Sequence, residues 1–157
     1  MGTRSLTVCK SRWTEEDAFS TDATIYRHSD GYPSQQGDLL HCILNDLVLA
    51  NGIGSGTPKN AVNGPGRLAT RIILAMGKAG ALPSLEAPNS TMGQKWEYHI
   101  ETTFSCDDSP ADNLNAGIKV RVFSRPMTAF GLGGEDCTEE VFFGTNEEFS
   151  KWLQGAK

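Results

Sequence analysis

Side chains capable of chemistry are concentrated in residues 26 to 32, YRHSDGY. His28 near Asp30 has the composition of a general acid-base pair, because a carboxylate can orient an imidazole. The alternative is structural, with Asp30 capping a turn and Arg27 forming a surface ion pair. Strand alternation puts Tyr26 and His28 on one face and Arg27 on the other, so they share a pocket only if the strand is an edge or the turn curls back. Tyr32 completes this candidate binding site.

A second candidate site lies at Asn63-Gly64-Pro65-Gly66-Arg67, where a helix is expected to begin. Free amide groups and the helix dipole favour an anion at such a position, and Arg67 could add a bidentate clamp. The plainer interpretation is a loop with Pro65 in the first helical position. The glycine-rich segment 51 to 56 is a weak phosphate-binding signal, because it follows a helix and lacks the Lys and Ser or Thr of a P-loop.

The chain shows no arrangement typical of an enzyme or a metal site. It has no Gly-x-Ser-x-Gly motif, and its four cysteines include no CxxC pair. His41 and His99 have no Glu or Cys at ligand spacing and are expected to face solvent. Cys42 lies beside apolar helix positions, where a buried and inert thiol is expected. We therefore expect no catalytic residue, no metal and no cofactor, and a protein that is not an enzyme.

Hydrophobic periodicity predicts the elements that must position these residues. A helix should begin at Asp38 and end at Asn51-Gly52, and a second should run from near Pro65 to Gly80. Thr145 and Glu148 have the spacing of a capping box that opens a short terminal helix. Alternation predicts five strands, at residues 6–9, 23–28, 96–104, 118–122 and 137–143. The order ββααβββα predicts an α+β domain, with an antiparallel sheet of about five strands and the helices on one face.

Length and charge limit the class of protein. The 157 residues fit a single domain spanning 1–157, and the formal net charge is −5 without a cluster of Lys and Arg. Direct binding to nucleic acid is therefore not expected. The first residues lack the apolar core of a signal peptide, and no run is long enough to span a bilayer. We expect a cytoplasmic protein with no membrane contact.

Several of these segments carry a resemblance. The string YRHSDGYP at residues 26–33 with Gly37, the segments 51–54 and 63–69, and Glu97-Tyr98 resemble a family of small uncharacterised proteins encoded by bacteriophages and related mobile elements. The resemblance covers roughly residues 3 to 155. It implies a phage origin and a location in the cytoplasm of the host cell, and it lends no catalytic residue.

Three hypotheses follow. The leading one is a non-enzymatic protein that binds a host protein, including as an inhibitor of antiviral defence such as CRISPR, because an acidic protein suits a basic, nucleic-acid-binding surface. The second is a pocket protein that binds or processes a small nucleotide-like anion with Arg27 or Arg67, and it requires residues 26–32 and the second helix start to meet in one cleft. In the third, the motif is architectural: Asp30, Gly31 and Pro33 set the turn, and the tyrosines pack over the first helix.

Overall fold

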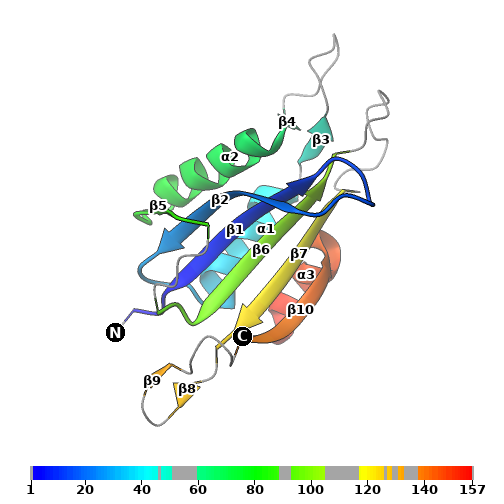
Figure 1. Ribbon diagram of the computed structural model, residues 1–157. Coiled ribbons are helices and arrows are strands. Elements are labelled where there is room, and N and C mark those ends of the chain that lie inside the picture. The colour runs from blue at the N-terminus through cyan, green and yellow to red at the C-terminus, as the bar shows by residue number, and fades with distance from the viewer. Residues whose placement is uncertain are drawn as a thin grey trace.

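A six-stranded mixed sheet forms the centre of the molecule (Figure 1). The computed structural model describes residues 2–45, 47–50, 60–88, 93–104, 117–125, 127–128, 131–132 and 138–156. Within them the strand order in the main sheet is β10-β7-β6-β1-β2-β5. The strands are β1 (Ser5–Arg12), β2 (Ser20–Arg27), β5 (Ser84–Glu86), β6 (Trp96–Thr103), β7 (Ile118–Ser124) and β10 (Glu139–Thr145). Only the β1–β6 pair is parallel among these neighbours.

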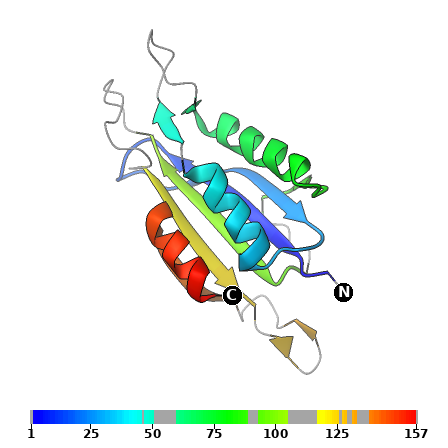
Figure 2. The ribbon, with the colours of Figure 1, turned by 180° about the vertical axis from the view of Figure 1, so that it is seen from behind.

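The helices cover one face of this sheet (Figure 2). They are the π-helical turn η1 (Pro33–Gly37) and the α-helices α1 (Asp38–Leu44), α2 (Pro65–Lys78) and α3 (Asn146–Gly155). Two small two-stranded sheets complete the described elements: β3 (Val48–Ala50) with β4 (Ala61–Asn63), and β8 (Met127–Thr128) with β9 (Gly131–Leu132). None of the helices in the described ranges has the length and apolar character needed to cross a bilayer.

The α+β class and the placement of the helices on one face are confirmed, but three details of the prediction are wrong. The sheet is mixed rather than antiparallel. It also has a sixth strand, β5, which is only three residues long, too short to give a recognisable alternation in the sequence. The first helix stops at Leu44, and Val48 begins strand β3. Alternation assigns side chains to faces, but it does not identify the neighbouring strand.

The hydrophobic core lies between the sheet and the helices. Strand β1 is central, and its residues Ser5 to Cys9 are buried on both faces. The capping box that begins α3 is present, with the Thr145 hydroxyl accepting from the Glu148 amide. It holds α3 so that its aromatic residues pack on β10. The largest fully buried side chains of the core include Ile25, Leu40, Leu68, Ile72, Tyr98, Ile100 and Phe149.

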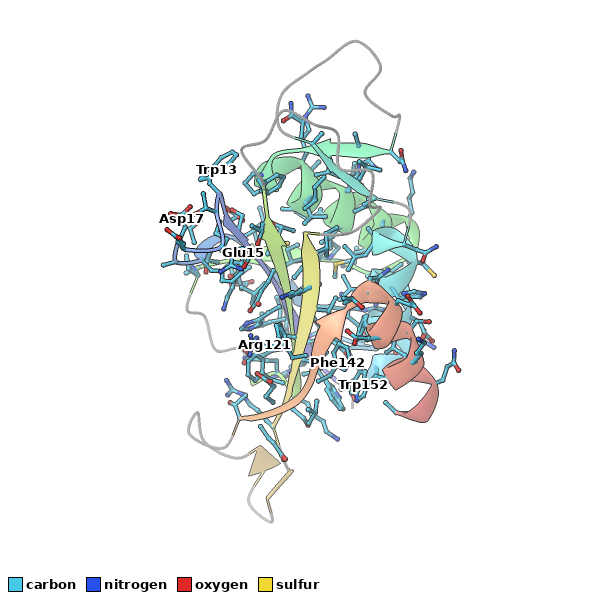
Figure 3. All side chains as sticks on the ribbon, turned by 90° about the vertical axis from the view of Figure 1, so that its right-hand side faces the viewer. Trp13, Glu15, Asp17, Arg121, Phe142 and Trp152 are labelled. Atoms are coloured by element: carbon cyan, nitrogen blue, oxygen red, sulfur yellow. The ribbon has the colours of Figure 1, made fainter. Side chains whose placement is uncertain are left out.

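The opposite face of the sheet is polar. Strand register places Glu101 beside Lys119 and His99 beside Arg121 on this side. Figure 3 shows Trp13, Glu15 and Arg121 on this side, away from the helices. We call this surface the polar face; its strand residues include Arg12, Glu97, His99, Glu101, Lys119, Arg121 and Phe143.

Candidate functional site

Arg27 belongs to a buried hydrogen-bond network on the helix side of the sheet. Its Nε donates to the Ser29 carbonyl at 2.7 Å, and its Nη1 donates to Gln36 Oε1 at 2.8 Å. The Gln36 amide in turn donates to Thr7 Oγ1 at 2.9 Å. Arg27 therefore joins β2 to η1, and its side chain is 9% exposed. A guanidinium with these partners has a structural role.

Tyr26 and His28 point to the other side of β2, as alternation predicts. The Tyr26 hydroxyl and His28 Nδ1 lie 3.0 Å apart, and the two rings meet edge to face. Asp30 instead forms a long ion pair with Arg27, at 3.9 Å from Nη2 to Oδ2. The geometry thus pairs His28 with a phenol rather than with the carboxylate that the acid-base hypothesis requires.

The turn itself is shaped by Asp30 and Gly31. Asp30 has a positive φ of 58°, a conformation in which Asp is tolerated better than most residues. Gly31 lies against the first strand, where a Cβ would come within 2.7 Å of the backbone of Arg4 and Ser5. Tyr32 precedes η1, and its side chain is half-exposed.

Asn63 and Arg67 lie at the far end of α2 from this turn. Met76, near the C-terminal end of α2, is the part of the helix that contacts Gln36, with 3.9 Å between Sδ and Nε2. Arg67 is nine residues earlier, which at 1.5 Å per residue is about 13 Å along the helix axis. Arg67 is exposed, and Asn63 is half-buried at the end of β4. The ribbon shows the end of β2 toward the C-terminal end of α2 and the start of α2 beside β4 (Figure 1). The two predicted groups therefore lie toward opposite ends of this helix.

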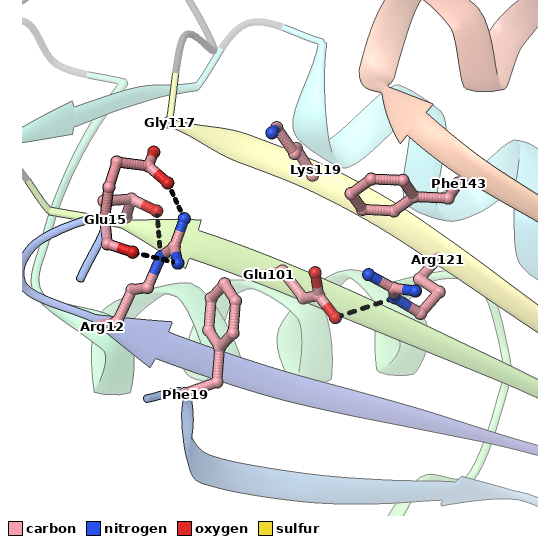
Figure 4. A pocket seen from close by; sticks show the side chains of 9 residues that line it. Arg12, Glu15, Phe19, Glu101, Gly117, Lys119, Arg121 and Phe143 are labelled. Atoms are coloured by element: carbon pink, nitrogen blue, oxygen red, sulfur yellow. Dashed lines mark hydrogen bonds and ion pairs between the residues drawn. The ribbon is translucent and has the colours of Figure 1, made fainter. Parts of the chain in front are cut away.

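A pocket that was not predicted opens on the polar face (Figure 4). Its volume is about 200 Å³, and it is lined by Arg12, Glu15, Phe19, Glu101, Thr103, Gly117, Lys119, Arg121 and Phe143. These residues come from β1, the β1–β2 connection, β6, β7 and β10. Alternation indicated that Glu101, Lys119 and Arg121 share the polar side of their strands, but only the strand order brings Arg12 and Phe143 to them.

Two arginines organise the pocket. Arg12 donates to the Glu15 carbonyl at 2.7 Å and to Thr103 Oγ1 at 3.0 Å, and it pairs with the Glu15 carboxylate. Arg121 donates to Glu101 at 3.1 Å and pairs with Glu140. Partial burial alone would lower the pKa of Arg121, but the hydrogen bonds with the two carboxylates raise it above its ordinary value.

Aromatic rings flank both arginines. The Arg12 guanidinium carbon lies 4.6 Å from the centroid of Phe19, and that of Arg121 lies 4.1 Å from the centroid of Phe143. These are cation–π distances. The pocket thus combines two arginines held by carboxylates with aromatic walls.

A second polar cluster surrounds Glu97 on the same face. Gln94 Nε2 donates to this carboxylate at 2.7 Å, Arg125 Nη2 donates at 3.0 Å, and His99 Nε2 lies 3.4 Å away. Burial alone would raise the pKa of Glu97, but these hydrogen bonds and the positive charges outweigh it and lower the pKa to about 2. The His99 ring lies 4.8 Å from the Phe123 ring, tilted by 56°, and His99 is mostly buried, so the expectation that it faces solvent is wrong.

The expectations for His41 and Cys42 are also wrong. His41 is half-buried and its Nδ1 lies 3.2 Å from Asn146 Oδ1, so it also does not simply face solvent. Cys42 is exposed rather than buried, whereas Cys9 is the buried thiol. Over the part of the chain that the structure describes, no three His, Cys, Asp or Glu side chains are grouped as metal ligands.

Comparisons of the chain with protein-family models, with curated proteins and with solved structures find no match. The function therefore has to be inferred from the residues and geometry of the molecule itself.

Proposed function

We propose that this protein is a non-enzymatic binding protein that contacts a partner protein through the polar face and the connection between β1 and β2. The observation that carries the proposal is the gathering of exposed aromatic side chains there: Trp13 is 50% exposed, Phe19 37% and Phe143 45%. Phe19 and Phe143 line the same pocket, and Trp13 lies on the same side of the sheet (Figure 3). Aromatic residues and arginines dominate the energetically important positions of protein interfaces.

The β1–β2 connection is held in a defined shape before any partner arrives. Arg12 donates a hydrogen bond to the Glu15 carbonyl and forms an ion pair with the Glu15 carboxylate, and its guanidinium lies over the ring of Phe19. The Thr14 amide donates to Asp17 Oδ2 at 2.8 Å. The Trp13 ring packs on buried Phe104 at 5.7 Å. A loop that is already ordered loses little conformational entropy on binding, which favours affinity.

The source and partner proposed here rest on the sequence. The resemblance of residues 26–33 supports a phage-encoded protein that acts in the cytoplasm of the host cell and binds a host protein. Glu15, Glu16 and Asp17 lie two to four residues after Trp13 and are exposed, which suits a partner surface with basic residues around the tryptophan contact. A nucleic-acid-binding component of antiviral defence, such as CRISPR, has a surface of this kind.

The alternative function, binding or processing a nucleotide-like anion, has less support. It required residues 26–32 and the start of α2 to share a cleft, and they lie toward opposite ends of that helix. The pocket on the polar face is also smaller than the roughly 300–1,000 Å³ typical of small-molecule sites.

The experiment is affinity capture of tagged protein from bacterial lysate, with the Trp13→Ala, Phe143→Ala and Leu74→Ala variants in parallel. Leu74 is 59% exposed on α2, on the helix side, and is the matched control. We expect one stoichiometric partner, with affinity reduced about thirtyfold or more by Trp13→Ala, as for an interface hot spot, and unchanged by Leu74→Ala. Absence of any partner, or loss of binding in the Leu74 variant alone, would reject the proposal.

A further inference from the structure

We propose that the partner protein adds an extended segment to the outer edge of β10, with a basic side chain beside Glu139 and apolar side chains against Trp152 and Phe143. This inference rests on the proposed function and gives it a mode of binding, the addition of one strand to the sheet.

Strand β10 is the longer of the two edge strands. It has seven residues and, in the part of the chain that the structure describes, β7 is its one strand neighbour. The strand at the other edge, β5, has three residues. An edge strand presents a row of backbone N–H and C=O groups that no strand of its own sheet satisfies. The edge of β10 therefore offers an added strand the longer ladder.

Aromatic side chains flank this edge on both faces of the sheet. Phe143 is exposed on the polar face, opposite Arg121 of β7. On the helix side, the Phe142 ring packs on the half-buried Trp152 of α3, with 5.4 Å between the ring centroids. Figure 3 shows Phe142 and Trp152 next to each other, where α3 meets β10.

Trp152 lies on the side of α3 that faces away from the other helices. Asn146, on the same helix, faces α1, and its Oδ1 lies 3.2 Å from His41 Nδ1. Trp152 is six residues later, which places it about 120° around the helix from Asn146. Figure 2 shows α3 at the outer side of the helix layer, next to α1. The Trp152 ring therefore borders the open edge of β10.

The charges around this edge leave one carboxylate without an ion pair. Each of the other acidic residues of β10 and α3 has a positively charged neighbour. These neighbours are Arg121 for Glu140, Lys151 for Glu147 and Lys119 for Glu148. Glu139 is exposed and forms no ion pair with a residue of the described ranges. Its uncompensated negative charge is complementary to a Lys or Arg of the partner.

The arrangement specifies the side chains of the added strand. Glu139 lies opposite Ser124 and Phe142 opposite Val122, so both are on the helix side of the sheet. Because side chains alternate along a strand, one face of the added strand meets Glu139 and the Phe142–Trp152 pair, and its other face meets Phe143. A matching segment carries a basic and an apolar side chain on the first face and an apolar side chain on the second.

The edge is also selective. The register between β10 and β7 shifts between Glu140 and Phe142, which is a bulge at Val141. Bulges and charged side chains keep an edge strand from pairing with other exposed strands, including the same edge of another copy. These features favour a partner segment of matched charge over a second copy of this chain.

The test is an NMR titration of isotope-labelled protein with three blocked hexapeptides. They are Ser-Arg-Val-Val-Val-Ser, the same peptide with Glu in place of Arg, and the Arg peptide with methylated valine nitrogens, which keeps the side chains but removes the ladder donors. We expect saturable shifts of the Val141, Phe142 and Phe143 amides with the Arg peptide. The Glu peptide should bind about fivefold more weakly, and the methylated peptide should not bind.

Charge reversal at Glu139 sharpens the test. Glu139→Lys should weaken binding of the Arg peptide about fivefold and strengthen binding of the Glu peptide, because a repulsion replaces an exposed ion pair of similar size. Glu86→Lys makes the same change on β5, at the other edge of the sheet, and should bind both peptides as the wild type does.

Absence of saturable shifts in β10 at millimolar Arg peptide, equal binding of the methylated peptide, or equal effects of the two Lys variants would overturn the inference. A dimer of the free protein that the Arg peptide dissociates would assign the edge to a second copy and also overturn it. The titration needs no natural partner, so peptide binding with a failed lysate capture rejects the proposed function alone. Capture without peptide binding rejects the strand addition alone.

Discussion

Substitution of Gly31 by Ala is expected to destabilise the fold strongly, although it adds only one methyl group. The new Cβ would lie 2.7 Å from the Arg4 carbonyl carbon and from the Ser5 nitrogen, which are backbone atoms that cannot rotate away. The turn would have to move, and with it two hydrogen bonds: the Gly31 amide donates to the Thr3 carbonyl at 2.8 Å, and the buried Tyr98 hydroxyl donates to the Gly31 carbonyl at 3.0 Å.

The magnitude follows from these contacts. Overpacking costs about 1–3 kcal/mol, and each weakened hydrogen bond about 1 kcal/mol. With two hydrogen bonds affected, we therefore expect the free energy of unfolding to fall by about 3–5 kcal/mol, a large part of the roughly 5–15 kcal/mol of an ordinary domain. Urea denaturation followed by tryptophan fluorescence should show a lower midpoint with an unchanged slope.

A matched substitution should have the opposite sign. Gly77 lies within α2, and a Cβ there would meet nothing within 4 Å. Gly77→Ala should raise the free energy of unfolding by about 0.5–1 kcal/mol, because Ala is the better helix former. If Gly31→Ala stays within about 1 kcal/mol of the wild type, or if both variants move together, the close approach at Gly31 is not what the turn requires.

Three other predictions concern single side chains. Arg27→Ala should lower the free energy of unfolding by about 2–4 kcal/mol, since buried acceptors lose a charged donor. His28 is exposed, so His28→Ala should change this free energy by under about 0.5 kcal/mol. Equal effects of the two substitutions in urea denaturation would contradict the buried network. The folded pKa of Glu97, about 2, lies below the ordinary 4.5, so its contribution to stability should be complete above pH 4.5 and lost as the pH falls toward 2. The difference in unfolding free energy between wild type and Glu97→Gln should shrink through that window, and a difference independent of pH would refute the assignment. Burial raises the pKa of the Cys9 thiol to about 12, while Cys42 is exposed. Iodoacetamide should therefore label Cys42 in the native protein and Cys9 only after unfolding, which peptide mapping would show. Labelling of Cys9 in the native protein would count against its burial.

Local signals in the sequence predicted the starts of α1, α2 and α3 and the strands β1, β2, β6, β7 and β10, because their physical causes are local. The start of α2 follows from Pro65 in the first turn, and its end from Gly80, which adopts a positive φ of 78°. The Thr145–Glu148 capping box marks the start of α3 in the same way. The parallel pairing of β1 with β6 has no local signature, because alternation is identical for every choice of neighbour.

The candidate site was harder to predict for a related reason. The composition of residues 26–32 predicted a binding site, yet Arg27 is buried and donates a hydrogen bond to Gln36. The pocket residues Arg12, Glu101 and Phe143 are distant in the chain and meet only through the strand order. Even His99, correctly assigned to the polar side of its strand, is covered by a ring from the neighbouring strand. The face of the sheet on which a side chain lies can be predicted from the neighbouring residues in the sequence. The residues that surround it depend on the order of the strands, which local sequence does not determine.

The central position of β1 also constrains how the chain can fold during synthesis. The first strand emerges early and can pair with β2, but its other edge waits for β6, and contacts between them, such as Arg12 with Thr103, span 91 residues. Pairings this remote in sequence give a high contact order and slow folding. Until β6 is made, the nascent hairpin presents an edge of unpaired backbone N–H and C=O groups, the kind of surface on which chains aggregate. A chain truncated before Trp96 would retain that edge permanently, so fragments ending there should be more prone to aggregation than the whole protein.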